Sequence, residues 1–241
     1  MDAAPSPVTE EPPSRDWSLL PLDALSLVFV RLGALEVLRG AGLVCRSWLD
    51  AAKVPDVWRV VDMENHKMML TKNSDALQAT AKVAVDRSSG QLQLFAGSQF
   101  VTEELMQYIV ERSPLLSTLR LVSCRKVLGE RLSAVIRESP LSKLSSLELD
   151  FVDLTMGELT VVLENCPILE VLTVRDCWKM DEKDEQVLRA KFSRIKTLTF
   201  EDYEDFDWYD YEFMKCLSNL FCDTYRYIYV CDASMLLSML C

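Results

Sequence analysis

Few side chains in this 241-residue chain have the types and spacing that catalysis requires. Catalysis needs a nucleophile or an acid that a partner residue orients. The sequence shows no recognisable Ser-His-Asp set, Cys-His pair, glycine-rich phosphate loop or paired-carboxylate motif. Its single histidine, His66, lies between Asn65 and Lys67, where a surface or turn position is expected. We therefore predict that the chain is not an enzyme and uses no cofactor.

Cys45 is the cysteine that most invites a catalytic reading, because Arg46 follows it and nearby positive charge favours a thiolate. Its place in an apolar helical pattern instead predicts a buried, unreactive thiol. The eight cysteines are scattered rather than densely spaced, which indicates free thiols in a reducing compartment. Since there is one histidine and no Cys-x-x-Cys pair, we expect no metal site.

The overall charge favours some classes of partner over others. The formal net charge of −11 argues against a nucleic-acid surface, which needs clustered Lys and Arg, and favours basic partners. No signal-peptide pattern opens the chain, and Asp23, Arg31 and Glu36 interrupt its most apolar stretch, residues 22–38. We expect no membrane span, and a cytoplasmic or nuclear location.

The first 63 residues divide into a tail and a small helical module. Residues 1–16 hold four prolines among small and acidic residues, which predicts a disordered tail. Pro21 and Asp23 mark the start of a helix that runs to about Arg31. Glycines then separate two further short helices. The first helix carries an apolar stripe of Leu25, Val28, Phe29 and Leu32, widened by Leu22, Leu27 and Val30. A module of this size cannot enclose so much apolar surface, so a partner or the following domain must cover it.

Three short motifs in this module carry a resemblance to a known family. They are Leu20-Pro21-Leu22-Asp23-Ala24-Leu25, Leu43-Val44-Cys45-Arg46-Ser47-Trp48 and Pro55-Asp56-Val57-Trp58-Arg59. In order and spacing, residues 17–63 resemble an F-box, although Asp23 stands where glutamate is common. The resemblance implies docking to a Skp-type adaptor, which joins a cullin and a RING subunit. Trp48 and Trp58 are expected to hold the module together. The residues that the resemblance places at the adaptor are Leu20, Pro21, Leu25, Val28, Phe29, Leu32, Leu38, Val44 and Cys45.

A repeated strand pattern occupies residues 64–200. It occurs at Leu92-Gln93-Leu94, Leu119-Arg120-Leu121, Leu147-Glu148-Leu149, Leu172-Thr173-Val174 and Leu198-Thr199-Phe200, at intervals of 25 to 28 residues. Helical segments that end at Pro114, Pro140 and Pro167 precede the later strands. Such intervals are typical of leucine-rich repeats. The predicted fold class is therefore α/β: a three-helix F-box, then a short solenoid with parallel strands on its concave face and helices on its convex face.

Two details refine the repeats. Cys124 and Cys177 each follow a strand by three residues, which resembles the cysteine-containing repeats common behind F-boxes, where the thiol fills the turn. Val61 and Met63 are interpreted as a degenerate first strand, with residues 73–85 as its helix, which would join the F-box to the repeats.

Side chains between the strand leucines should line the concave face, because strand residues alternate between faces. Their mixed charge suits a protein target, although any one of them could be merely solvated. The predicted target-binding residues form one row of Gln93, Arg120, Glu148, Thr173 and Thr199 and a second row of Phe95, Val122, Asp150, Arg175 and Glu201.

The last segment, residues 201–241, follows the repeats. Every position from 201 to 213 is acidic or aromatic, which fits either a cap on the last repeat or a docking strip for a basic partner. Residues 214–241 are apolar, too short and interrupted for a membrane span, and expected to pack on the repeats.

These observations favour one function over two others. The resemblance, closest in pattern to plant F-box and leucine-rich-repeat proteins, implies a substrate-recognition subunit of a Skp-cullin-F-box (SCF) ubiquitin ligase. Such a subunit would bridge the adaptor and a target protein for ubiquitination and degradation. A repeat scaffold without ligase assembly is the alternative. A third hypothesis, an enzyme forming a ubiquitin thioester on a cysteine, lacks a supporting motif.

Overall fold

The structure is a computed structural model of the chain, and it describes residues 16–64, 74–124, 127–175 and 182–201. Several predictions fall outside these residues: the tail up to residue 15, His66, Cys177, the acidic-aromatic segment beyond Glu201, and residues 214–241. For Glu201 the backbone alone is described.

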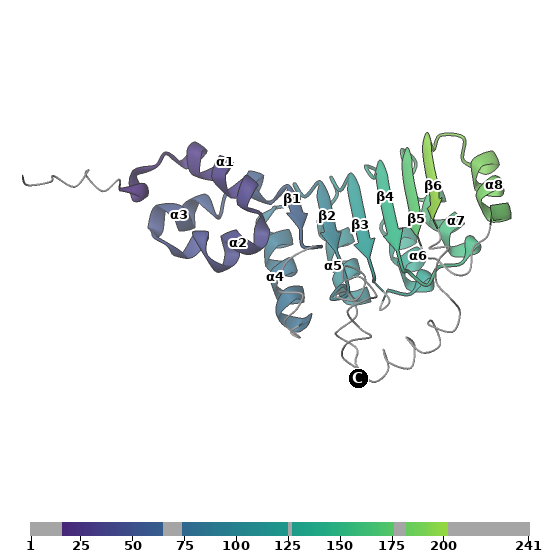
Figure 1. The fold of residues 1–241 in the computed structure, drawn as a ribbon, viewed down its shortest axis with the longest axis horizontal. Helices are drawn as coiled ribbons and strands as arrows, with labels where there is room; N and C mark the ends of the chain where they lie inside the picture. The colour runs from purple at the N-terminus through teal and green to yellow at the C-terminus, as the bar shows by residue number, and fades with distance from the viewer. Residues whose placement is uncertain (1–15, 65–73, 125–126, 176–181, 202–241) are drawn as a thin grey trace, which may run out of the picture.

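The N-terminal module consists of short helices packed on one another (Figure 1). The predicted helix from Pro21 to about Arg31 is confirmed, and Pro21 occupies the position just before its first turn. The elements are η1 (Trp17–Leu19), α1 (Leu22–Leu32), α2 (Ala34–Arg39), η2 (Ala41–Leu43), α3 (Arg46–Ala51) and η3 (Pro55–Trp58).

Two glycines shape this module. Gly33 has a φ of 90°, a left-handed conformation that glycine adopts without strain, and it separates α1 from α2. Gly42 is required for space. A Cβ atom there would lie 2.7 Å from the carbonyl oxygen of Val37 and 3.1 Å from the Cβ of Ala52. The glycines predicted to separate the short helices therefore also let η2 approach α2.

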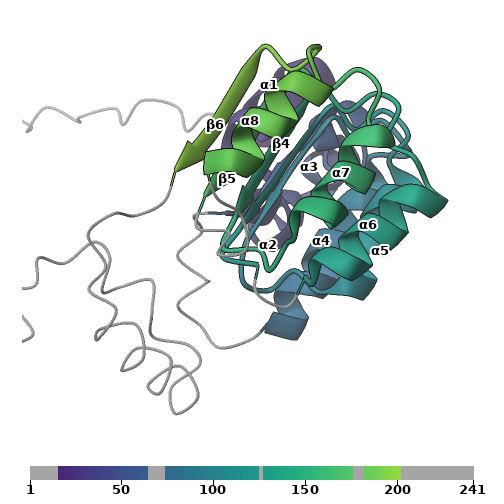
Figure 2. The same cartoon turned by 90° about the vertical axis from the view of Figure 1, so that its right-hand side faces the viewer.

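The rest of the described chain alternates strands and helices. All six strands are parallel and pair in sequence order (Figure 1). Helices α5, α6 and α7 lie side by side against one face of the sheet, as Figure 2 shows. The predicted helix, proline, strand unit is confirmed, which makes the chain an α/β solenoid of the leucine-rich-repeat kind. The elements are β1 (Val60–Asp62), α4 (Ser74–Arg87), β2 (Leu94–Gly97), α5 (Glu103–Arg112), β3 (Thr118–Val122), α6 (Gly129–Glu138), β4 (Ser146–Asp150), α7 (Met156–Glu164), β5 (Val171–Arg175), α8 (Glu182–Lys191) and β6 (Thr197–Glu201).

The pairing register corrects one predicted strand. Leu92-Gln93-Leu94 was expected to match Leu119-Arg120-Leu121, but the residue paired with Leu119 is Phe95. The prediction relied on the Leu-x-Leu pattern. In this repeat, however, the aromatic ring of Phe95 fills the core position of the strand, and Leu92 is buried just before the strand begins. The row of core residues that the register aligns is Val61, Phe95, Leu119, Leu147, Leu172 and Leu198.

A single core runs from the module into the repeats. The degenerate first strand is confirmed, since Val61 pairs with Phe95 and both side chains are fully buried. Helix α4 contacts both η3 and α2 of the module. The N-terminal module therefore covers the β1 end of the sheet and shares its hydrophobic core with the first repeat.

Candidate functional site

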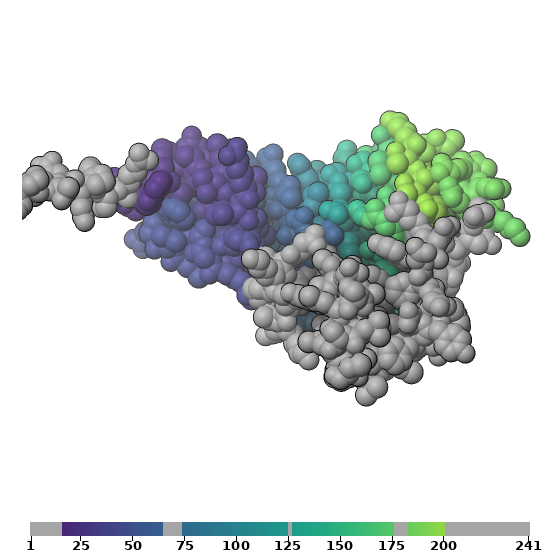
Figure 3. All heavy atoms as spheres, viewed as in Figure 1, coloured from purple at the N-terminus to yellow at the C-terminus, as the bar shows by residue number. Residues whose placement is uncertain are grey.

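The N-terminal module exposes an unusual number of large apolar side chains for its size. Leu19, Leu43 and Val44 are exposed to 78%, 71% and 63% respectively. A soluble chain rarely leaves so many such groups in water unless another protein covers them. Figure 3 shows the module forming one end of the molecule, away from β6. We call the following exposed residues the module surface: Trp17, Leu19, Leu22, Leu27, Val28, Val30, Leu32, Leu43 and Val44.

The predicted adaptor-binding residues differ in their exposure to solvent. Val28, Leu32 and Val44 belong to the module surface, and Pro21 is also exposed. Leu20, Leu38 and Cys45 are half-buried and remain partly available.

Leu25 and Phe29 require a correction. They lie one turn apart on α1, so they point in the same direction, and they are exposed to 1% and 0%. Phe29 packs edge to face against Trp48, with ring centroids 5.6 Å apart. Both side chains fill the core of the module, so neither has a surface to offer to an adaptor in this structure.

The module surface also contains six residues outside the predicted adaptor-binding set: Trp17, Leu19, Leu22, Leu27, Val30 and Leu43. The sequence does contain a signal for part of this group, because α1 is apolar around most of its circumference. A helix with one packed face leaves the remaining apolar residues in solvent.

Two tryptophans hold the module in shape, as predicted. Trp48 donates its indole N–H to the carbonyl oxygen of Trp17 at 3.0 Å, and Ser47 donates its hydroxyl to the carbonyl of Ser18 at 2.9 Å. These bonds fix η1 against α3. Trp58 is fully buried and donates to the carbonyl of Ala52 at 3.0 Å, which ties η3 to the end of α3.

The prediction that Cys45 is buried is wrong. Cys45 is half-buried and lies immediately before α3, with its Sγ 3.1 Å from the hydroxyl oxygen of Ser47. A hydrogen bond with the Ser47 hydroxyl, followed by one with the backbone N–H of Trp48, lowers the pKa of the Cys45 thiol below its ordinary value. The apolar pattern misled the prediction because the residues around Cys45 face solvent rather than a core.

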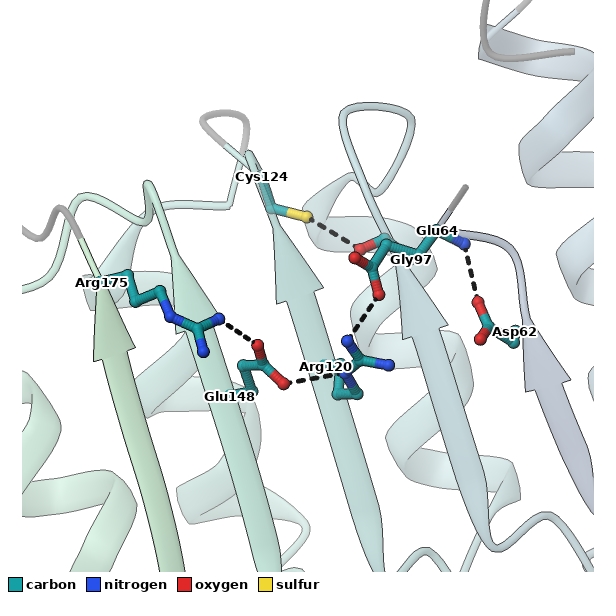
Figure 4. Close-up of polar contacts among 7 residues, drawn as sticks. All are labelled: Asp62, Glu64, Gly97, Arg120, Cys124, Glu148 and Arg175. Atoms are coloured by element: carbon teal, nitrogen blue, oxygen red, sulfur yellow. Dashed lines mark hydrogen bonds and ion pairs between the residues drawn. The ribbon is translucent and has the colours of Figure 1, made fainter. Parts of the chain in front are cut away.

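The concave face of the sheet carries a chain of ion pairs (Figure 4). Arg120 on β3 lies 2.9 Å from Oε2 of Glu64, which follows β1, and its Nε lies 2.8 Å from Oε2 of Glu148 on β4. Arg175 on β5 bonds the other oxygen of Glu148 through Nη1. Three strand side chains, together with Glu64 just after β1, thus form one alternating network.

Small residues on β2 make this network possible. Glu64, which lies just after β1, and Arg120 on β3 are on either side of β2, so their ion pair spans that strand. The β2 residue paired with Arg120 is Ala96, and Ser98 follows two residues later; both are fully buried. Ala96, which the register places beside Arg120, leaves room on β2 for this ion pair.

The other residues of the two predicted rows differ in their position and burial. Gln93 precedes β2, so Ala96 takes the place expected for it beside Arg120, and Phe95 points into the core rather than across the concave face. Val122 is buried. Thr173, Thr199 and Asp150 are half-buried on the face as the register requires. The remaining row member, Glu201, pairs with Arg175 through its backbone position.

The ion-pair network changes the pKa of Glu148. Burial raises the pKa of Glu148, but hydrogen bonds from Arg120 and Arg175 outweigh burial, so the pKa lies below its ordinary value. A carboxyl group whose pKa falls on folding stabilises the folded state above its unfolded pKa, about 4.3 for glutamate. That contribution is lost as the pH falls through the folded-state value.

Replacing Glu148 by glutamine should therefore have a pH-dependent effect. At pH 7 we expect Glu148→Gln to lower the free energy of unfolding by about 1 kcal/mol, because half-exposed ion pairs contribute modestly. The difference should be smaller at about pH 3.5, below the unfolded glutamate pKa of about 4.3, because the ionised carboxyl group stabilises the folded state less there. Urea denaturation at the two pH values measures this. Glu130→Gln, on the exposed side of α6, is the control. An equal loss at both pH values would contradict the role of the charge.

Cys124 fills the turn at the end of β3, as predicted. Its thiol lies 3.5 Å from the carbonyl oxygen of Val122 and 3.7 Å from that of Gly97, and it is fully buried. Burial strongly raises the pKa of the Cys124 thiol. The three cysteines of the described residues, Cys45, Cys124 and Cys166, are free thiols.

Residues 16–64, 74–124, 127–175 and 182–201 contain no group of three or more His, Cys, Asp or Glu side chains placed to hold a metal ion. None of the helices in those ranges combines the length and apolarity needed to cross a membrane.

Comparison with known proteins agrees with this arrangement. The F-box-like family model matches residues 17–64, which include the whole module and β1. The chain is 31% identical over 189 residues to F-box protein SKIP19 of Arabidopsis thaliana, a match that covers 78% of this chain and 61% of the relative.

Two further relatives from Arabidopsis thaliana are named as F-box/LRR-repeat proteins. The chain is 33% identical over 158 residues to F-box/LRR-repeat protein 23, a match that covers 66% of this chain and 34% of the relative. It is 35% identical over 182 residues to F-box/LRR-repeat protein 22, a match that covers 74% of this chain and 57% of the relative. The chain thus spans about three fifths or less of the length of these curated relatives. The F-box-like match over residues 17–64, the parallel strand and helix repeats, and relatives named as F-box/LRR-repeat proteins show that the chain belongs to the plant F-box and leucine-rich-repeat proteins.

Proposed function

We propose that this chain is a substrate-recognition subunit of an SCF ubiquitin ligase. The module surface would dock on a Skp-type adaptor, which joins the cullin and the RING subunit, and the concave face would hold a target protein. The observation that carries the proposal is the exposed apolar surface on the module that the F-box-like model matches. Members of this family generally act as such receptors.

The chain's contribution would be binding rather than chemistry. Holding a target near the ligase raises its effective concentration at the ubiquitin-transfer site, so the chain itself needs no reactive group. The shared core between the module and the first repeat supports this role. It fixes the direction in which the concave face points relative to the adaptor-binding end.

One observation favours the alternative of a scaffold without ligase assembly. The module covers the β1 end of the sheet, and solenoids need such caps at their ends. A cap, however, needs apolar residues on its inner side alone. The exposed apolar groups of the module surface have no role in a cap, and they support docking to an adaptor.

Co-purification tests the proposal. The full chain, mixed with a purified plant Skp-type adaptor, should elute from a gel-filtration column as a one-to-one complex, and adding cullin and RING subunits should enlarge the complex. Because the module surface is preformed, binding should require no further factor. If chain and adaptor elute separately at micromolar concentration, the scaffold function would replace the proposed one.

A further inference from the structure

The first turn of the module, η1, is exposed to solvent and has little apolar packing of its own. None of its three residues is buried, and Trp17 and Leu19 are among the exposed apolar residues of the module. Hydrophobic stabilisation scales with the apolar area removed from water, so it contributes little to holding this turn. Because Trp17 and Leu19 belong to the module surface, the contacts that hold η1 also set the shape of that surface.

The hydrogen bonds within η1 define the turn but do not attach it to the rest of the module. Oδ1 of Asp16 accepts the backbone N–H of Ser18 at 2.9 Å and the Ser18 hydroxyl at 2.6 Å. The backbone N–H groups of Leu19 and Leu20 donate to the carbonyls of Asp16 and Trp17 over longer distances, 3.3 and 3.4 Å. All of these bonds join residues at most three positions apart.

Two side chains at the start of α3 make the attachment. The Ser47 hydroxyl donates to the carbonyl oxygen of Ser18, and the Trp48 indole N–H donates to that of Trp17. These bonds join segments 29 and 31 positions apart in the sequence. Trp48 also packs against Phe29 in the core of the module, so replacing it would disturb more than η1. The hydroxyl of Ser47 can be removed without loss of that packing.

We propose that Ser47 is a positioning residue for adaptor binding. Its bond to the Ser18 carbonyl holds η1 on α3 in the conformation that presents Trp17 and Leu19 to the adaptor, and Ser47 itself does not have to touch the adaptor. When the bond is absent, η1 occupies this conformation for a smaller fraction of the time, and the apparent affinity falls by that fraction. The inference rests on the proposed function, because it names a residue that acts through the module surface.

Removing one hydroxyl group tests the inference. Ser47→Ala should weaken adaptor binding by about threefold to tenfold, as expected for the loss of a single hydrogen bond. The change should appear mainly in the association rate constant, because fewer molecules are ready to bind, whereas loss of a direct contact mainly raises the dissociation rate constant. Surface plasmon resonance with a purified plant Skp-type adaptor measures both constants. Ser47→Thr keeps the hydroxyl and should restore the affinity to within about twofold of the wild type.

Ser117→Ala is the matched control. Ser117 is half-buried like Ser47, and its hydroxyl donates to the carbonyl of Gln93 at 3.0 Å, 24 positions away, but it lies in the repeats just before β3. This variant should bind the adaptor like the wild type. Alanine is a better helix former than serine, and residue 47 lies within α3, so thermal unfolding of Ser47→Ala should occur at no lower temperature than that of the wild type.

A double-mutant cycle shows whether Ser47 acts through η1. When Trp17→Ala and Leu19→Ala are already present, η1 offers the adaptor neither side chain, so adding Ser47→Ala should change the affinity by less than about twofold. An undiminished effect would overturn the inference. It would mean that the hydroxyl acts elsewhere, for example through Sγ of Cys45, which lies 3.1 Å away.

Hydrogen exchange of the free chain separates this inference from the proposed function. The backbone amides of residues 17–20 should exchange faster in Ser47→Ala than in the wild type or Ser117→Ala, because η1 opens more often. Unchanged exchange, or unchanged affinity for an adaptor that binds the wild type, would overturn the inference and leave the proposed function standing. A wild-type chain that binds no adaptor would contradict the proposed function and, with it, the role of Ser47 in adaptor binding.

Discussion

Replacing Leu43 and Val44 by aspartate should abolish binding to a Skp-type adaptor. Both residues are among the most exposed apolar residues of the module, so the substitutions leave the core untouched. Placing two carboxylates in an apolar interface buries charges without partners, and central interface residues each account for 2 kcal/mol or more. We expect the affinity to fall by at least about 100-fold. Isothermal titration calorimetry with purified adaptor measures the change.

Matched controls separate interface loss from misfolding. Val187→Asp on α8 makes the same kind of change at a residue exposed to 54%, at the other end of the solenoid, and should bind the adaptor like the wild type. Circular dichroism and the unfolding midpoint of Leu43→Asp with Val44→Asp should match those of the wild type within a few degrees. Wild-type affinity in the double variant would show that the adaptor, if it binds, uses another surface.

Replacing Trp58 by alanine should destabilise the module and the repeats together. Trp58 is fully buried at the junction, and its indole donates to the carbonyl of Ala52. Arg87 from α4 donates to the same carbonyl at 3.2 Å, and its guanidinium lies 5.2 Å from the Trp58 ring. Removing a buried tryptophan costs about 3–5 kcal/mol. Because the core is continuous, the whole described chain should unfold in one transition at a lower urea concentration.

The matched control is Trp17→Ala, which removes the same side chain where it is 57% exposed. It should change the free energy of unfolding by less than about 1 kcal/mol, since Trp48 bonds the backbone carbonyl of Trp17 and not its ring. Tryptophan fluorescence and far-ultraviolet circular dichroism are followed in the same titration. If the repeats of Trp58→Ala unfolded at the wild-type midpoint while the module unfolded early, the two parts would be independent units.

The sequence by itself determined the order and type of most elements, although it did not predict α8. Pro21 and the glycines at 33, 40 and 42 set where the short helices begin and end, because these residues act on the local backbone. The prolines after α5, α6 and α7 and the recurring leucines placed the repeats for the same reason. Even the degenerate strand at Val61 was predictable, since β-branched residues follow the end of the helical module.

The tertiary structure decided which side chains are available. Leu25 and Leu27 are the same residue type two positions apart on α1, yet one is buried and the other is exposed to 69%. Likewise, Phe95 entered the core where Leu92 was expected, because the register depends on pairing with β1 and β3. Glu64, Arg120, Glu148 and Arg175 became one network because parallel strands bring together residues that lie 27 to 56 positions apart in sequence. Local sequence specifies backbone conformation, whereas exposure and contact depend on how distant elements pack, and the surfaces proposed here for adaptor and target are properties of that packing.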